Sequence, residues 1–344
     1  MQKFFFPLFI TICFISSCKD TSNKNTSQNN ASQKDSVEKV KEEEKKAENS
    51  TPITASDISL TKEITFEKYT LEDKYKYKDT FRVFQWDKIK EQLAYIENFQ
   101  KEKVNYGLVS NYKNKHGEAP TVANFKRNVY KRVSDTLGTE RYQSVPLYKV
   151  GETKTPIIYG RDGSLVKLLT SDTVKMVTIK GLTNFEGEWD IPKRYVKSIG
   201  DTATFRHIVV VDVKNQNICA LEHKDGHNWI IRSMNPATTG KHNPPYGMET
   251  PVGIYLLQEQ KSKMFYFGDG TTTIEGFAPW ASRFTNGAYI HGVPVNNPKG
   301  SIVEYSATLG TTPRSHMCVR NASSHAKFVY DWIKPFQSLV IVID

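Results

Sequence analysis

From Phe205 onward the chain alternates short apolar runs with turns rich in Asn, Gly and Pro, and this pattern constrains the fold more than any other feature. Short apolar runs bounded by such turns are typical of β-strands, and several of them at regular spacing indicate two packed sheets. We therefore predict a mainly β fold with a C-terminal β-sandwich. The expected strands lie at Ile208–Val213, Trp229–Arg232, Gly253–Leu257, Ala288–His291 and Leu339–Ile343.

One helix is expected within this region, from Ser323 to Trp332, because Ala326, Val329 and Tyr330 recur at helical spacing and should face inward. The helix would begin shortly after Cys318. Its N-terminal dipole would then favour a negative charge nearby.

The 344-residue chain is longer than one typical domain, so we expect further units upstream. Residues 58–140 contain two apolar stripes at helical spacing and are predicted to be a short helical accessory region. The stripes are Trp86, Ile89, Leu93, Ile96 and Phe99, and then Val122, Phe125, Val129 and Val133. Residues 141–200 have the short runs and Gly turns of a small β-barrel. The end of this region, Gly187–Val196, resembles the close of an SH3-like domain, which would bind substrate or a partner, or serve as a spacer.

The N-terminus has the features of an export signal. Lys3 precedes an apolar run from Phe4 to Ile15, which is too short for a permanent transmembrane helix. The run ends Ile15-Ser16-Ser17-Cys18, which resembles a lipobox, so residues 1–18 would be a lipoprotein signal peptide with lipidation at Cys18; the alternative is an ordinary signal peptide. Residues 19–57, largely low-complexity, are predicted to be a disordered tether. We expect a membrane-anchored lipoprotein that faces the periplasm or cell envelope.

The net charge of +10 does not by itself define a partner. The chain shows neither clustered basic residues nor a nucleic-acid-binding motif, so dispersed surface lysines are the simpler explanation, and no nucleic acid is expected.

The segment Thr311–Arg320 contains the strongest candidate for chemistry. Cys318 follows His316 by two residues and precedes Arg320 by two. A thiol attacks as the thiolate, and its pKa of about 8.5 falls beside cationic or imidazole groups, so we expect these neighbours to lower the pKa of Cys318. A second imidazole, His291, lies upstream. Taken alone, Cys318 would more simply be an inert buried thiol.

Several motifs together resemble the L,D-transpeptidase (YkuD-type) catalytic domain, in family order from about Phe205 to Asp344. They are Ser315-His316-Met317-Cys318-Val319-Arg320, Ile290-His291-Gly292, Thr250-Pro251-Val252-Gly253-Ile254-Tyr255, and Ile208–Val213 followed by Asn215-Gln216-Asn217. Two positions depart from the family. Met317 stands where the family usually has Gly, and His325 where it has Asp. Residues 201–344 would accordingly be the catalytic domain, and Met317 puts the shape of its acyl pocket in question.

The resemblance implies roles for the residues. Cys318 would be the nucleophile and His291 the general base, with the Gly292 carbonyl orienting the imidazole. His316 would contact substrate or support the oxyanion, whose donors would be backbone N–H groups around Met317 and Cys318. Two further residues would assist: Ser315 would support the loop by hydrogen bonding, and Arg320 would tie the loop down or meet a substrate carboxylate.

The implied reaction is acyl transfer on peptidoglycan stem peptides without metal or organic cofactor. Cys318 would form a thioester with release of D-Ala, and an amine acceptor would complete a cross-link. Alternatives are an L,D-carboxypeptidase, in which water is the acceptor, and a catalytically inactive wall-binding lipoprotein. We expect a monomer that binds peptidoglycan and, through the lipid on Cys18, the membrane.

Other readings of the sequence are weaker. A sortase-like enzyme would need its cysteine closer to Thr308-Leu309-Gly310-Thr311. A metal site at His223, His227 and His242 lacks the expected glutamate, so surface histidines are favoured. Cys219 should be a buried thiol. A disulfide between Cys219 and Cys318 would block the nucleophile, so we predict a free Cys318.

Overall fold

The structure is a computed structural model, and it describes residues 51–344. The predicted signal peptide, Cys18 and most of the tether lie outside the described residues. Pro52–Asp344 fold as one compact unit. No helix in this part of the chain is long and apolar enough to cross a membrane.

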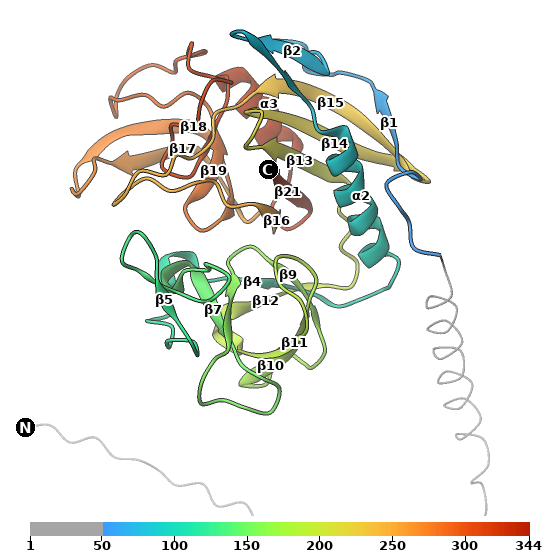
Figure 1. The fold of residues 1–344 in the computed structure, drawn as a ribbon, viewed down its shortest axis with the longest axis vertical. Helices are drawn as coiled ribbons and strands as arrows, with labels where there is room; N and C mark the ends of the chain where they lie inside the picture. Colours follow the sequence, from blue (N-terminus) through green and yellow to red (C-terminus); the bar gives the residue numbers. More distant parts are fainter. Residues whose placement is uncertain (1–50) are drawn as a thin grey trace, which may run out of the picture. The chain divides into compact units, whose positions relative to one another are not determined.

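A six-stranded sheet is the centre of the fold (Figure 1). Its strand order is β1 (Ser59–Lys62), β15 (Asn228–Pro236), β14 (Asn217–Asp225), β13 (His207–Asp212), β21 (Ser338–Ile343) and β16 (Gly253–Leu256). Strand β13 pairs with β21 in parallel and with β14 in antiparallel register. Strands β13 and β21 are apolar along nearly their whole length because the sheet is covered on both faces, so side chains that point to either face are buried.

Helix α2 (Trp86–Gln100) covers one face of this sheet and confirms the first predicted helical stripe. Its buried Ile89, Leu93 and Ile96 share a core with Ile208, Val210 and Trp229. The helix also supplies Glu97, whose carboxylate accepts hydrogen bonds from Trp229 Nε1 at 2.7 Å and His227 Nδ1 at 2.5 Å. This accessory helix therefore shares the core of the C-terminal strands β13 and β15.

A four-stranded sheet and helix α3 (Ser323–Trp332) lie on the other face. The sheet order is β17 (Glu259–Phe267), β18 (Ile274–Thr285), β19 (Ala288–His291) and β20 (Val319–Arg320). Val209 and Val211 of β13 pack against Ile290 and Val319, and Val329 of α3 joins the same core. Strand β19 and helix α3 have the predicted bounds, and the β-sandwich prediction is confirmed.

The region predicted as an SH3-like β-barrel is an open sheet, so the barrel prediction is wrong. Its order is β11 (Glu188–Pro192), β10 (Met176–Gly181), β9 (Leu165–Leu168), β4 (Tyr106–Val109) and β12 (Val196–Gly200). Strand β4 comes from the predicted helical region and separates β9 from β12. Strand β11 pairs with β10 on one side and forms an antiparallel bridge from Asp190 to Tyr148 on the other. A separate hairpin, β7 (Ser144–Leu147) with β8 (Ile158–Arg161), precedes β9. We call the five-stranded sheet and this hairpin the accessory sheet.

The second predicted helical stripe does not form a helix. Val133 lies in β6 (Val133–Ser134), which pairs with β5 (Lys126–Arg127), and Phe125 and Val129 are exposed. Left-handed backbone at Asn124 (φ 53°) interrupts any helix there. One more hairpin, β2 (Lys74–Tyr77) with β3 (Thr80–Val83), lies between β1 and α2.

Candidate active site

The candidate nucleophile and base come together because β19 and β20 are parallel neighbours. Ile290 pairs with Val319, and both side chains are buried in the sandwich core. Successive side chains of a strand point to opposite faces. His291 follows Ile290 and Cys318 precedes Val319, so both side chains belong on the face away from the core.

His291 is buried and held in one tautomer. Its Nδ1 donates a hydrogen bond to the carbonyl oxygen of Gly292 at 2.6 Å. Nε2 is therefore left as the proton acceptor in the neutral ring. Burial lowers the pKa of His291 to about 4, with the Arg320 charge acting in the same direction and the Gly292 bond opposing them. The imidazole is neutral at physiological pH, as a general base must be.

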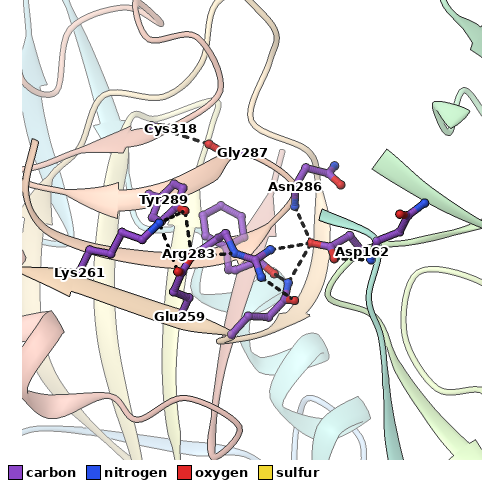
Figure 2. Close-up of polar contacts among 11 residues, drawn as sticks. Asp162, Glu259, Lys261, Arg283, Asn286, Gly287, Tyr289 and Cys318 are labelled. Atoms are coloured by element: carbon purple, nitrogen blue, oxygen red, sulfur yellow. Dashed lines mark hydrogen bonds and ion pairs between the residues drawn. The ribbon is translucent and has the colours of Figure 1, made fainter. Parts of the chain in front are cut away.

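The expected low pKa of Cys318 is not what the structure gives. The residue is only partly buried, but its surroundings are dense enough that burial raises the pKa of the thiol. The Tyr289 backbone N–H and the Arg320 charge act to lower this pKa without overcoming burial. The thiol donates to the carbonyl oxygen of Gly287 at 3.5 Å (Figure 2). Cys318 thus rests as a thiol and His291 as a neutral imidazole, and not as a thiolate–imidazolium pair.

Met317 occupies a backbone conformation that favours glycine. Its φ is +149°, whereas L-residues rarely adopt positive φ. The side chain is buried in the sandwich core. The surrounding backbone is held by Thr250 Oγ1, which donates to the Met317 carbonyl at 2.7 Å and accepts the Gly240 N–H at 2.8 Å. The family's preference for Gly at this position therefore has a conformational basis, and Met317 keeps the strained backbone with an added apolar anchor.

At position 317 the glycine variant should be more stable than the alanine variant, the reverse of the usual order. Both Met317→Ala and Met317→Gly lose the buried side chain and are expected to destabilise the fold, but only glycine relieves the positive φ. We expect Met317→Gly to be more stable than Met317→Ala by about 1 kcal/mol or more. Urea unfolding of the two variants measures this difference. An alanine variant as stable as the glycine variant, or more so, would show that the backbone relaxes without cost.

The segment before the cysteine has one free candidate for the oxyanion donor. The Met317 N–H donates to Ser315 Oγ at 3.3 Å, and Ser315 Oγ–H donates to the Cys318 carbonyl. Ser315 therefore supports the loop as expected. The Cys318 N–H has no hydrogen-bond acceptor within residues 51–344, which leaves it, of the two N–H groups expected, as the available donor.

His316 is exposed and lies away from the buried pair. Its Nε2 is 3.2 Å from the Asp269 carboxylate, which belongs to the tip of the β17–β18 hairpin. A cavity of about 640 Å³ opens beside this histidine, and its charged lining residues are Lys241, Arg314, His242, His316 and Glu249. Cys318 does not line the cavity. The contact between Asp269 and His316 instead joins the hairpin tip to the nucleophile segment.

Arg320 carries a largely desolvated charge. Its backbone ties the loop, since its N–H donates to the Thr238 carbonyl at 2.8 Å and its carbonyl accepts the Thr238 N–H at 2.9 Å. The guanidinium forms no ion pair within residues 51–344, and its Nε is buried without a partner. Burial lowers the pKa of Arg320, while the neighbouring Cys318 acts to raise it. An unpaired buried cation beside a nucleophile is suited to an anionic ligand.

Three other predicted features can be placed. His325 is fully buried in α3, with Nε2 at 3.0 Å from Ser233 Oγ, so it is a core residue. Cys219 and Cys318 are both free, as expected. His223 and His227 lie near the Glu97 carboxylate, and no group of three metal-ligating side chains occurs among residues 51–344.

The sequence reasoning missed the polar groups that face the thiol. The Gly287 carbonyl belongs to the turn between β18 and β19 and the Tyr289 N–H to β19, and backbone groups leave no residue-type signal. The role of Thr250 was also missed, although its motif was noted. The Asn-Gly pair at 286–287, which is typical of a tight hairpin turn, could have identified this turn.

Comparison with known proteins relates the C-terminal part of the chain to one family. Residues 206–342 match the family model of the YkuD L,D-transpeptidase catalytic domain. No curated protein matches the chain. Similar solved structures include an L,D-transpeptidase from Mycobacterium smegmatis, at 16% identity over 52% of this chain and 82% of that one, with a TM-score of 0.33. Another, from Mycobacterium tuberculosis H37Rv, has 19% identity over 46% and 72%, with a TM-score of 0.31.

A fused Zn-dependent amidase/peptidase/peptidoglycan-binding domain-containing protein from Clostridium acetobutylicum is also similar, at 18% identity over 40% of this chain, with a TM-score of 0.29. The chain spans about half the length of that protein, 52%. The family match, and not these distant structures, identifies the C-terminal part. Residues 206–342 are an L,D-transpeptidase catalytic domain of the YkuD family.

Proposed function

We propose that the protein is a cysteine-dependent L,D-transpeptidase that acts on peptidoglycan stem peptides. The observation that carries the proposal is the neutral His291, fixed by Gly292 with Nε2 free, on the strand that pairs with the Cys318 segment. This arrangement gives a thiol and a base on one face of the sheet. Family membership of residues 206–342 supplies the substrate class.

The first half-reaction forms a thioester. His291 Nε2 takes the Cys318 proton as the sulfur attacks the carbonyl carbon of the third stem residue, and the Cys318 N–H stabilises the oxyanion. The tetrahedral intermediate collapses when the imidazolium gives its proton to the departing amine of D-Ala. Because both groups are neutral at rest, attack requires that the thiol proton pass to His291.

The second half-reaction transfers the acyl group. An amine of a neighbouring stem attacks the thioester while His291 accepts a proton, and the imidazolium then protonates the departing thiolate. With water in place of the amine, the same steps give a carboxypeptidase. In both cases the acceptor's proton passes through His291 to the sulfur, and the free Cys318 thiol is regenerated.

Charge near the thiol supports an anionic substrate. Arg320 has no carboxylate partner within residues 51–344, and Lys241 and Arg314 line the adjacent cavity with only Glu249 opposing them. Stem peptides carry carboxylates, which such cations bind. Because the Arg320 backbone already ties the loop to Thr238, its side chain is available for this contact.

The cellular setting is part of the same proposal. The lipobox-like Ile15-Ser16-Ser17-Cys18 supports a lipid anchor on Cys18, and the low-complexity segment after it supports a tether that extends a monomeric enzyme toward the wall from a membrane facing the periplasm.

The proposal is tested with the full chain and purified disaccharide-tetrapeptide, followed by mass spectrometry. The expected product is a cross-linked dimer with loss of D-Ala, absent with Cys318→Ala. Tripeptide alone would indicate a carboxypeptidase. If the wild type gives neither product nor an acyl adduct, the proposal fails, and a wall-binding role is left.

A further inference from the structure

The turn between β8 and β9 places one accessory-sheet carboxylate against the catalytic domain. Asp162 is fully buried, and its Oδ1 accepts the Asn111 N–H at 2.8 Å. Its Oδ2 accepts three donors, namely Gln258 Nε2 at 3.0 Å, Arg283 Nη1 at 2.9 Å and the backbone N–H of Asn286 at 2.8 Å (Figure 2). Four donors on one buried carboxylate fix its position firmly.

Backbone contact strengthens this docking. Thr285 Oγ1 donates to the Asp162 carbonyl oxygen at 2.5 Å. Gly163, with φ +93°, lies so close to β18 that an added Cβ would be 2.3 Å from the Phe284 carbonyl oxygen. Only glycine fits at this position. The turn of the accessory sheet therefore lies directly against the end of β18.

Asp162 holds the Asn286-Gly287 turn, and this turn faces the Cys318 thiol. Asn286, whose N–H is bound by Asp162, immediately precedes Gly287 in the β18–β19 turn. The Gly287 carbonyl accepts the Cys318 thiol (Figure 2), and the Tyr289 backbone N–H acts to lower the pKa of the same thiol. The residue bound by the Asp162 carboxylate, Asn286, is therefore the sequence neighbour of Gly287, whose carbonyl binds the thiol.

The other end of the turn is anchored through the same arginine. The Tyr289 hydroxyl donates to Glu259 Oε2 at 3.1 Å, and Arg283 Nε lies 3.4 Å from that oxygen. Arg283 thus joins Glu259 to Asp162, so one carboxylate holds the turn and the other holds the Tyr289 side chain of β19.

We propose that Asp162 is a positioning residue for Cys318: it fixes the β18–β19 turn, which in turn shields the thiol from water and sets its hydrogen bonds. The accessory sheet is then part of the construction of the active site and not a separate binding module. The catalytic consequence rests on the proposed function, whereas the effect on the thiol does not. Arg320 is the charged group that acts on the sulfur, and the hydrogen bonds of the Asp162 carboxylate go to other residues.

Alkylation of the thiol tests this inference without any acyl substrate. The full chain and its Asp162→Asn variant are treated with iodoacetamide over a range of pH, and modification is read peptide by peptide. Asparagine keeps the shape but cannot accept all four donors, so the turn should loosen and admit water. Since burial then raises the thiol pKa less, Cys318 should react about fivefold faster near neutral pH, with its rate profile shifted to lower pH.

Two controls distinguish positioning from loss of stability. Asp190→Asn removes another buried carboxylate of the accessory sheet, whose side chain accepts the Gly151 N–H at 2.9 Å and the Thr178 hydroxyl at 2.8 Å, within that sheet. It should leave Cys318 reactivity within about twofold of wild type. Cys219, buried in the core, reports any general opening.

Faster alkylation of Cys318 alone, in Asp162→Asn alone, supports the inference. Unchanged reactivity of Cys318 in that variant would overturn it. Equal gains at Cys219 would also overturn it, because Asp162 would then act on the stability of the whole domain. If the protein fails to cross-link stem peptides, the proposed function fails, but the alkylation result still tests the role of Asp162.

Discussion

Replacement of His291 by alanine is expected to slow acylation of Cys318 by about 10²- to 10⁴-fold. The reason is that Cys318 rests as a thiol, with its pKa raised by burial, so attack requires a base to take its proton. The His291 ring is the neutral imidazole placed for this, with Nδ1 bound to Gly292. Mass spectrometry of the acyl adduct formed with a carbapenem, a class of compound expected to acylate this family, measures the rate.

His316→Ala is the matched control for this prediction. This histidine lies only two residues before Cys318 in sequence, but it is exposed and lies 3.2 Å from the Asp269 carboxylate. Its loss should reduce acylation by less than about tenfold, because it removes an exposed side chain and not the proton acceptor. Equal losses in the two variants would contradict the assignment of His291 as the base.

Acidification should destabilise the fold through buried neutral histidines. Burial lowers the pKa of His291 to about 4 and that of His325 to about 3, whereas an unfolded histidine titrates near 6.5. Between these values the unfolded chain binds more protons, so stability present above about pH 6.5 is lost as the pH falls. From about pH 8 to about pH 5, each histidine should lower the free energy of unfolding by about 2 kcal/mol.

The contribution of His325 can be isolated by mutation. His325→Gln retains hydrogen-bonding capacity toward Ser233 but does not titrate. It should remove about half of the acid destabilisation measured by urea unfolding at several pH values, apart from a smaller effect in the same direction from His207, whose pKa burial also lowers. His316→Gln, at an exposed position, serves as the control. An unchanged pH dependence in His325→Gln would contradict the prediction.

Local sequence patterns predicted the elements around the nucleophile. The helical spacing of Ala326 and Val329 predicted α3, and the apolar run at 288–291 predicted β19, with the bounds that the structure has. The helical stripe from Trp86 predicted α2. These succeeded because short-range periodicity records which side of an element is buried, whatever the element packs against. The motif residues Cys318 and His291 were likewise evident without coordinates.

The electrostatic state of the cysteine could not be predicted in the same way. Neighbours in sequence, His316 and Arg320, suggested a lowered pKa, but His316 turns to Asp269 and burial outweighs the charge of Arg320. Desolvation depends on every group packed around the sulfur, including the Gly287 carbonyl from a distant turn. Proximity in the sequence reveals only the charged residues on the same segment, and not the groups from distant segments that bury the thiol.

The sequence alone determined the sandwich, its flanking helices and the candidate nucleophile with its base. Tertiary structure decided which sheet each strand joined and what surrounds the thiol. Strand β4 joins the accessory sheet, which is open. From that sheet, Asp162 binds the backbone of the turn that faces Cys318. The physical reason is that periodicity specifies the buried face of a strand, whereas its partner is chosen by packing and hydrogen bonding among residues far apart in the chain.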